Sequence, residues 1–524
     1  MYDVQQADIQ LLRQRAKNIY TKIQLLNDNM TIMDEMQGVF IDGTVSIDSS
    51  SAIRRTFDVT IYIKDSSYVA SETARVWMDK RIRVMIGFLY LRTNQIRWYS
   101  LGVYKFSQNS FTFDATTKTL KVSCLDLMSG LNGELGGILI GEETQVPMGS
   151  NIRDAIVKTV TQLGECPKYR ISYREDTVPY DLSWGTGSDV WTILEELRDL
   201  YYSYEMFFDE DTFVCQRIPM NNGDPVVIGS GVLDELVISE ALTNSFTEVK
   251  NVVEIWGETT KSDYYADKSE YNDGVYTIYT NYAQVKDNKK FSFLAARENP
   301  AECSVKIVNT EPVSDGAVET HQVTYGPFVL YRSSVDDAGE DVRLSSGIME
   351  AGKYYVVRLK KDRTYFIGQT QIHAIVRLVN EMPSAEQAQK NKQLFACDNI
   401  GYVVNPDSPF TVEKIGEKVK VCSGGDYEKI YTDELALQRG EYEIYVGSRL
   451  TDSLTVECIL IPWLDVNNKV SYTARLADKK EERQYRISNI SMNLGSGTMT
   501  ITMARFYPYY PNTVKLPGVV TETS

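Results

Sequence analysis

Alternation of apolar and polar positions is clearest near the end of the chain. In residues 461–508, Tyr485, Ile487 and Asn489 alternate with Arg486, Ser488 and Ile490. After Gly495-Ser496-Gly497 the alternation resumes, with Met499, Ile501 and Met503 on one face and threonines on the other. A period of two on both sides of a glycine-containing turn predicts a β-hairpin that closes a β-domain.

The same period appears between residues 38 and 125. Each apolar series predicts one face of a short strand. The series are Val39, Phe40 and Ile41; Phe57, Val59, Ile61 and Ile63; Ile82, Val84 and Ile86; Ile96 and Trp98; Val103, Tyr104 and Phe106; and Leu120, Val122 and Cys124. Five or six regular strands with turn signals between them predict a small antiparallel barrel over residues 36–127.

Helical spacing marks two other regions. Residues 5–28 repeat apolar positions at steps of three and four, and this predicts an amphipathic helix in an N-terminal segment, 1–35. The series is Ile9, Leu12, Ala16, Ile19, Ile23 and Leu26. Residues 128–240 predict an α+β module with two helices, the first capped by Ser150 or Asn151 and the second by Ser188. A hairpin that turns at residues 209–211 follows the second helix.

The remaining chain completes the expected domain organisation. Residues 241–258 and 458–510 predict a second barrel, which is interrupted by a β-rich inserted domain at 259–457 and followed by a flexible or docked tail at 511–524. Within the insert, strands are expected from Tyr354, Thr364, Ile372 and Tyr442, and an exposed loop or short helix from Met382. The predicted fold is therefore a multidomain, β-rich α+β protein with two small antiparallel β-barrels joined by an α+β module.

Charge and cysteine content narrow the possible roles. The 524 residues carry a formal net charge of -16, which argues against sequence-specific nucleic-acid binding because that function requires a basic face. The seven cysteines form no Cys-x-x-Cys pair, so we expect reduced thiols and no zinc site. The polar N-terminus and the lack of an apolar run of about 18 residues predict a chain made in a cytoplasm, without a secretory signal or membrane segment.

Candidate catalytic residues are scarce. The only histidines are His321 and His373, and no nucleophile elbow, phosphate-binding loop or metalloprotease motif accompanies them. The acidic turn Asp209-Glu210-Asp211 lacks the spaced ligands of a calcium loop. Glu195 and Glu196 are adjacent on a predicted helix and point apart. We therefore predict no catalytic, cofactor-binding or metal-binding residues, no cofactor and no enzymatic activity.

Two groups of residues leave alternatives open. Arg54-Arg55 could grip an acidic partner, or could equally be strand-edge charges that discourage aggregation. Six tyrosines could stack on sugar rings or on a partner protein, although packing within a sheet is favoured. They are Tyr264, Tyr265, Tyr271, Tyr276, Tyr279 and Tyr282.

Four stretches, in order, resemble the hub proteins of phage tails and baseplates and of related contractile injection systems. They are SAIRRTFDVTIYI at 51–63 with the two strands that follow it, the helix and hairpin at 188–219, SFTEVKNVVEIWGE at 245–258, and PWLDVNNKVSYT at 462–473 with its closing hairpin. The resemblance covers about residues 5–258 and 458–510, and it does not cover the insert.

This resemblance implies a structural hub that forms a homotrimeric, pseudo-sixfold ring of barrels. The ring would join the tail tube to the tip and let DNA pass without specific binding, through a lumen that the net charge predicts to be acidic. The implied neighbours are a distal tail or tube protein, a tape-measure protein, and tip or fibre proteins. The implied location is the virion tail, with synthesis and assembly in the host cytoplasm. Two alternatives remain, a tail-associated cell-wall hydrolase and a host-glycan-binding tail protein, both acting through the inserted domain.

Overall fold

The computed structural model divides the chain into two compact units, residues 1–245 with 451–509 and residues 246–450 with 510–524. It describes residues 4–15, 17–35, 40–63, 66–113, 118–141, 144–147, 149–178, 182–200, 203–259, 262–300, 302–313, 319–332, 343–344, 346–361, 363–369, 371–430, 432–476, 479–511 and 513–517. Among these residues, no helix is both long enough and apolar enough to cross a membrane.

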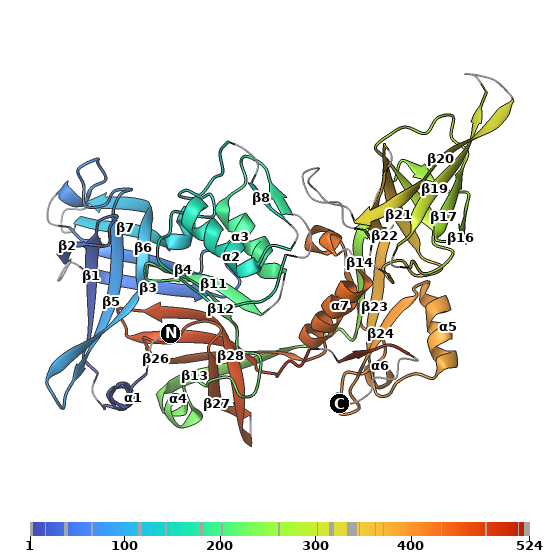
Figure 1. Cartoon of the computed structure of the whole chain (residues 1–524). Helices are drawn as coiled ribbons and strands as arrows, with labels where there is room; N and C mark the ends of the chain where they lie inside the picture. The colour runs from blue at the N-terminus through green and yellow to red at the C-terminus, as the bar shows by residue number, and fades with distance from the viewer. Residues whose placement is uncertain are drawn as a thin grey trace. The chain divides into compact units, whose positions relative to one another are not determined.

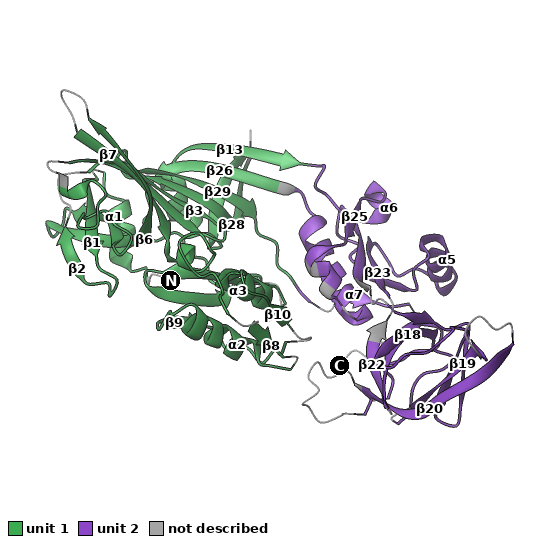
Figure 2. Ribbon diagram, turned by 90° about the horizontal axis from the view of Figure 1, so that it is seen from above, with its two compact units in different colours: residues 1–245, 451–509 green, residues 246–450, 510–524 purple. Residues whose placement is uncertain are grey.

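One large antiparallel sheet organises unit 1. Its strands follow the order β13-β26-β29-β28-β3-β4-β7-β6-β5-β1-β2, and β27 also pairs with β28. Their bounds are β1 Ile19–Leu26, β2 Ile32–Glu35, β3 Phe40–Asp48, β4 Arg55–Tyr62, β5 Arg81–Tyr90, β6 Gln95–Phe113, β7 Lys118–Asp126, β13 Val237–Ser245, β26 Thr451–Ile459, β27 Lys469–Leu476, β28 Lys479–Asn493 and β29 Thr498–Arg505. A short 3-10 helix, Ser66–Tyr68, lies between β4 and β5. Figure 2 shows β13, β26 and β29 side by side in this sheet.

The sheet contains the same five-stranded module twice. The first module has the order β3-β4-β7-β6-β5, and the second has the order β13-β26-β29-β28-β27. In both modules the fourth strand is long and changes partner along its length. In the first, β6 pairs with β5 up to Lys105 and with β7 from Tyr104; in the second, β28 pairs with β27 up to Arg486 and with β29 from Tyr485.

Irregularities in the two ladders also correspond. A β-bulge follows Phe106 in β6, and one follows Ile487 in β28. The first strands β3 and β13 each have a bulge at an exposed isoleucine, Ile41 and Ile238. A β-bulge changes the face to which the following side chains point. Bulges at matching places therefore allow the two modules to be aligned residue by residue. The alignment brings YKFSQNSF at 104–111 onto YRISNISM at 485–492, two segments that are similar in sequence.

Six aligned pairs on the second and third strands of the modules are buried in both. Side chains that point inward are apolar in both modules, and they belong to one hydrophobic core. The aligned pairs are Phe57 and Leu454, Val59 and Val456, Ile61 and Cys458, Leu120 and Met499, Val122 and Ile501, and Cys124 and Met503. The predicted inward face Met499, Ile501 and Met503 is confirmed. The bulge at Ser488 changes the predicted alternation in β28, since Ile490 is buried and Asn489 is not.

The two modules are joined to each other through β28 and β3. Residues 489–493 of β28 pair with residues 44–48 of β3, so the strands expected in two barrels form one continuous sheet. The second module is interrupted at the turn of its first hairpin, where Ser245 pairs with Thr451. All of residues 246–450 lie between these two paired ends, a position at which hairpins tolerate insertion.

The long N-terminal helix predicted at residues 5–28 is wrong. Helix α1 spans Gln6–Leu12, and residues 19–26 form β1, which pairs along its whole length with β5. The apolar spacing was compatible with either structure, and Tyr20, Thr21 and the β-branched Ile19 and Ile23 favour the extended one. Two residues of the predicted elements, Ala16 and Val39, lie outside the described residues.

The α+β module packs two helices on a small sheet. The helices α2 Ile152–Lys158, which continues into a π-helical turn, and α3 Val190–Asp199 lie against β9, β11 and β12 (Figure 1). The other elements are η2 Leu127–Gly130, β8 Thr144–Val146, β9 Tyr169–Ile171, β10 Leu182–Trp184, β11 Tyr204–Asp209, β12 Thr212–Arg217 and α4 Ser230–Leu236. The Asn151 side chain caps α2 as predicted, but Asp189 rather than Ser188 caps α3, accepting from the Thr192 N–H at 2.9 Å.

Unit 2 contains two sheets. An eight-stranded sheet has the order β15-β18-β21-β22-β20-β19-β17-β16, and a five-stranded mixed sheet has the order β25-β14-β23-β24-β30. The strands are β14 Val252–Thr259, β15 Tyr264–Tyr265, β16 Lys268–Asn272, β17 Val275–Thr280, β18 Lys289–Leu294, β19 Ser304–Pro312, β20 Thr320–Arg332, β21 Tyr354–Lys360, β22 Arg363–Gln369, β23 Gln371–Val379, β24 Asn399–Val404, β25 Val419–Cys422 and β30 Val514–Lys515. The helices are α5 Ala385–Phe395, α6 Val412–Ile415, η4 Gly425–Lys429 and α7 Asp433–Gly447.

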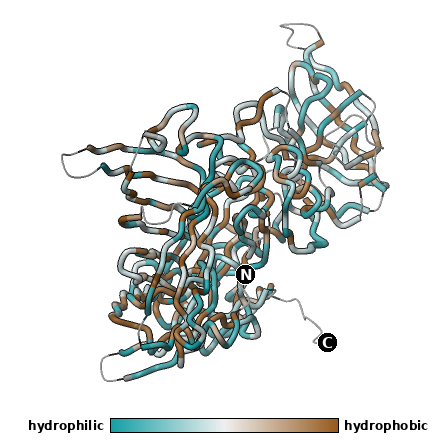
Figure 3. Tube along the Cα trace, turned by 90° about the vertical axis from the view of Figure 1, so that its left-hand side faces the viewer, coloured by the Kyte–Doolittle hydropathy of each residue, from teal (hydrophilic) through white to brown (hydrophobic). Residues whose placement is uncertain are grey.

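Two expectations for this region change, and one alternative is decided. Residues 252–258 do not pair within the second module, because β14 pairs with β23 and β25 in unit 2. The strand predicted from Tyr442 lies in helix α7, which packs on β14 and β23 through Ala436, Gly440 and Ile444, spaced by four residues. The tail is docked where described, since Val514 and Lys515 pair with β24. Figure 3 shows apolar and polar stretches alternating along the chain.

Candidate functional site

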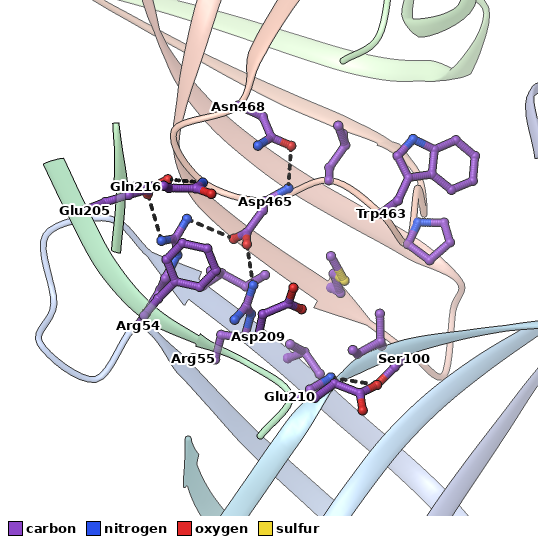
Figure 4. A pocket seen from close by; sticks show the side chains of 18 of the residues that line it. Arg54, Arg55, Ser100, Glu205, Asp209, Glu210, Gln216, Trp463, Asp465 and Asn468 are labelled. Carbon is purple, nitrogen blue, oxygen red and sulfur yellow. Dashed lines mark hydrogen bonds and ion pairs between the residues drawn. The ribbon is translucent and has the colours of Figure 1, made fainter. Parts of the chain in front are cut away.

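A buried network of charged side chains lies where the two modules and the α+β module meet. Arg54 precedes β4 at the turn of the first hairpin, and only 5% of its side chain is exposed. Its Nη1 donates to Glu205 Oε2 at 2.8 Å, and its Nη2 donates to the Val466 carbonyl at 2.8 Å. The same guanidinium pairs with Asp465 at 3.3 Å, so it joins β11 to the connection between β26 and β27 (Figure 4).

Arg55 extends the network in the opposite direction. Its guanidinium pairs with Asp465 and donates to the Phe208 carbonyl at 2.6 Å, and its backbone N–H donates to Asp126 at 2.8 Å. Burial lowers the pKa of Arg55, but the charge of Asp465 and other acids more than offsets this, and the net pKa is raised. The pKa of Asp126 is raised by burial to about 6, against the opposing effect of the Arg55 N–H and charge.

Further contacts complete the site. Glu205 accepts hydrogen bonds from Gln216 and Asn467, each at 2.8 Å. The Arg54 guanidinium lies 4.0 Å from the centroid of the Phe207 ring, and a cavity of about 330 Å³ lies beside the network. Trp463, in the same connection as Asp465, packs on Tyr99 with ring centroids 5.6 Å apart.

The arrangement links β11, the turn before β4 and the connection between β26 and β27 through ion pairs and hydrogen bonds. Both guanidinium groups are already paired with internal carboxylates, so Arg54 and Arg55 neither face an acidic partner nor line an exposed strand edge. Neither alternative left open by the sequence describes them. A buried pair of this kind adds little net stability relative to an apolar pair, but loss of one partner leaves an uncompensated charge.

Another buried cation in unit 1, Lys469, is not predicted by the sequence. Its side chain is fully buried, and Nζ donates to the carbonyls of Asn221, Asn222 and Asp224 at 2.9–3.2 Å. It fixes the segment that leaves the α+β module to the start of β27. A lysine that follows two asparagines gives no signal of burial in the sequence, because the carbonyls that surround it come from a distant turn.

Both histidines have neighbours that account for them. His373 stacks on Trp256 with centroids 3.8 Å apart, and its Nε2 lies 2.9 Å from Glu254. His321 lies 3.7 Å from Glu311, opposite it in the β19–β20 hairpin. The Cys397 thiol donates to the backbone carbonyl of His373 at 3.6 Å, but no interaction seen among the described residues joins either imidazole ring to a serine or cysteine side chain.

The acidic turn at 209–211 is the plain hairpin turn between β11 and β12. Its carboxylates pair with Arg170, Arg83 and Lys168. Glu195 on α3 pairs with Arg198 at 3.2 Å. In the part of the chain that the structure covers, no group of three or more His, Cys, Asp or Glu side chains is arranged to hold a metal ion.

The tyrosine cluster is mainly packed within the eight-stranded sheet. Tyr276 is fully buried and contacts Tyr271 and Phe293 at centroid distances of 4.7 and 5.8 Å. Tyr264 packs on Tyr282 at 4.6 Å and on Phe291 at 4.9 Å. Tyr265 is the exposed member. These contacts agree with the favoured interpretation, sheet packing, for most of the cluster.

All seven cysteines are free thiols. Burial raises the pKa of Cys166, Cys215, Cys303 and Cys397 to about 11, so their thiolate fraction near neutral pH is very small. The expected reduced thiols are therefore structural side chains.

Comparisons with known proteins give distant likenesses. Residues 407–510 match a family described as "Domain of unknown function (DUF5048)", and no curated protein matches. The 43 kDa tail protein of prophage MuSo2 from Shewanella oneidensis is similar over 92% of this chain and 98% of its own, with 10% identity and a TM-score of 0.46. A tail protein from Neisseria meningitidis is similar over 93% and 96%, with 10% identity and a TM-score of 0.44. A third, over 68% and 100% with 10% identity and a TM-score of 0.27, is the E. coli c3393 protein, a type VI secretion component.

Proposed function

We propose that this chain is a structural hub protein of a phage tail tip or baseplate. Three copies would form a ring that joins the tail tube to the tip and surrounds the path of the DNA. The single observation that carries this proposal is the duplicated module, in which two five-stranded units share strand order, bulge positions and inward-facing residues.

The duplication suits a symmetry adaptor. Closed cyclic symmetry requires each copy to present the same pair of complementary surfaces. Three chains, each with two similar modules, would present six similar modules to a sixfold tube and three identical chains to a threefold tip. The four sequence stretches that resemble tail hubs lie largely in unit 1 and support the same assignment.

The partners follow from this position. A distal tail or tube protein would lie on one side of the ring, tip or fibre proteins on the other, and the tape-measure protein at its centre. The net charge of -16 suits a lumen that repels phosphate, because a basic lumen would bind DNA by releasing counterions.

We propose a non-enzymatic role. In support, His321, His373 and the Arg54-Arg55 pair are all engaged by neighbouring side chains. We favour this role over glycan binding because Tyr264 and Tyr271 pack against the core of unit 2, which leaves Tyr265 as the exposed member of the six tyrosines.

Multi-angle light scattering of the purified chain tests the ring. The expected mass is three times the 59.5 kDa of one chain. A single species at 59.5 kDa over the whole accessible concentration range would contradict the proposal. Clearing of purified bacterial wall by the same preparation would contradict the non-enzymatic role.

A further inference from the structure

The strand pairing that joins the two modules within one chain indicates how two copies can pair with each other. Residues 489–493 of β28 pair with residues 48–44 of β3. The hydrogen bonds from Ser49 N to the Ser488 carbonyl (3.0 Å) and from Leu494 N to the Gly43 carbonyl (2.9 Å) close the two ends. Met492 and Val45 oppose each other in this junction and are both buried.

The first module has the counterpart of the β28 surface, and no strand among the described residues occupies it. One edge of β28 pairs with β29. The opposite edge pairs first with β27 and then with β3. On β6, β5 occupies the same edge only as far as Lys105. Within the described residues, no strand pairs with the rest of that edge, and residues 107–113 are all exposed.

The second module has the counterpart of β3, which is β13. Its inner edge pairs with β26, and none of the strands described pairs with its outer edge. The matching bulges at Ile41 and Ile238 align Val45 with Leu242. The chain therefore carries both halves of a second junction that it does not close itself.

Exposed apolar side chains lie on the part of β6 that no described strand covers. The bulges at Ser107 and Ser488 align Phe111 with Met492 and Phe113 with Leu494. Met492 and Leu494 are 1% and 4% exposed, whereas Phe111 and Phe113 are 44% and 65% exposed. Large exposed aromatic side chains beside an unpaired strand edge are typical of a surface that pairs with another chain.

We infer that β13 of a second copy of this chain pairs antiparallel with residues 108–112 of β6. Transfer of the internal register places Gln108 opposite Ser245, Ser110 opposite Thr243 and Thr112 opposite Ala241. Phe111 then lies opposite Leu242, where the internal junction has Met492 opposite Val45. This inference rests on the ring proposed above and names the surface that closes it.

The other edges of the sheet are blocked or poorly suited to pairing. Along β27, Ser471 N donates to the Ile228 carbonyl, Thr473 N to Asp234 and Arg475 N to Glu240, at 2.8–3.0 Å. At the opposite end of the sheet, β2 has four residues and includes Asp34 and Glu35. Short, charged edges and capped amides discourage strand addition. Pairing is thus directed to β6 and β13.

Disulfide trapping in the full chain tests the register. Ser110 and Thr243 are exposed, and their internal counterparts Ser491 and Ser46 are a directly opposed pair. Oxidation of the Ser110→Cys/Thr243→Cys variant is expected to convert most of the protein to covalent dimers and trimers on a non-reducing gel. Directly opposed residues lie within the Cα separation that a disulfide spans.

Two matched variants serve as controls. Ser46→Cys/Ser491→Cys is expected to form the equivalent disulfide within one chain, at monomer mass. Ser110→Cys/Asn244→Cys is expected to show little linkage, because a one-residue shift turns the second side chain to the opposite face. Equal linkage in this shifted variant would overturn the register.

The outcomes separate this inference from the ring. A trimeric mass without linkage of Ser110→Cys/Thr243→Cys would overturn the strand pairing and leave the ring in place. A monomeric mass at every concentration would overturn both. As a second measurement, Phe111→Asp is expected to reduce the trimer to monomer without loss of circular dichroism, whereas Leu394→Asp, at an exposed site in unit 2, is expected to leave the mass unchanged.

Discussion

Met492 in the second module and Phe111 in the first occupy aligned positions on matching strands, yet one is buried and the other is 44% exposed. The difference arises from a neighbour: β3 covers the edge of β28, and no described strand covers the corresponding edge of β6. A second difference lies at the first hairpin, which turns within residues 49–54 in one module and contains unit 2 in the other. The two modules thus share their pattern of strand pairing. They differ in which strand edges are covered and in what their first turn contains.

The largest expected effect comes from removing the buried ion pairs that link the two modules. Asp465→Ala removes the carboxylate shared by Arg54 and Arg55; Arg54 keeps Glu205, but the largely buried Arg55 guanidinium loses the carboxylate with which it pairs. We expect a loss of about 3–5 kcal/mol in the free energy of unfolding, measured by urea denaturation. The matched control is Glu235→Ala, which breaks an exposed pair with Arg13 and should cost less than about 1 kcal/mol. Equal losses in the two variants would show that the network does not hold the modules together.

Shortening the side chains of Met492 and Phe111 compares the covered strand edge of the second module with the uncovered edge of the first. Met492→Ala creates a cavity in the core and should cost about 2–5 kcal/mol. Phe111→Ala, examined in dilute monomer, should cost less than about 1 kcal/mol because its side chain is half in solvent. Thermal or urea unfolding of both variants measures the difference, and a larger loss for Phe111→Ala would contradict the alignment of edges.

A pH effect should distinguish the modules. Asp126 ends β7, and the aligned residue of β29 is Arg505. Because the folded-state pKa of Asp126 is about 6, above the value of 3.8 for an unperturbed carboxyl, the folded state binds more protons between these values. The Asp126 contribution is therefore present at low pH and is lost as pH rises from about 4 to above 6, by up to about 3 kcal/mol.

This contribution appears as a difference between the wild type and Asp126→Asn. The stability of the wild type relative to the variant should fall as pH rises from 4 to 7, as measured by urea unfolding at each pH. An increase over that range would show that Asp126 has a lowered pKa instead.

The smallest effect is expected from excision of the insert. Ser245 and Thr451 are already paired, so an Asn-Gly turn can join them in a chain of residues 1–245 and 451–509. We expect the free energy of unfolding of unit 1 to change by no more than about 1 kcal/mol. Failure of this chain to fold cooperatively would show that unit 2 is required by the module into which it is inserted.

Much of the strand pattern could be predicted from the sequence. Period-two series identified the strands near Phe57, Ile82, Leu120 and Met499, because each has one buried face. The predicted N-terminal helix is wrong at β1. Apolar residues spaced by three and four over a short stretch do not exclude a strand, and pairing with β5 stabilises the strand here. The strand predicted at Tyr442 is wrong because the short alternation of Tyr442, Ile444 and Val446 does not exclude a helix. Helix α7 packs Ala436, Gly440 and Ile444, spaced by four residues, on β14 and β23.

The site was harder to predict than the strands. Arg54-Arg55 was noticed, but Glu205 and Asp465 are 151 and 411 residues from Arg54 in the chain, and no local pattern links them. The duplication did leave a signal in the sequence, YKFSQNSF at 104–111 and YRISNISM at 485–492. Its residues are ordinary strand residues, so the repeat becomes evident only when the bulges align.

Electron microscopy of the purified assembly, viewed along its axis, tests the central claim most directly. The account predicts a closed ring of three copies in which six similar β-modules alternate around a central opening. A particle in which the two modules of each chain occupy unlike positions, or in which no opening is present, would contradict it.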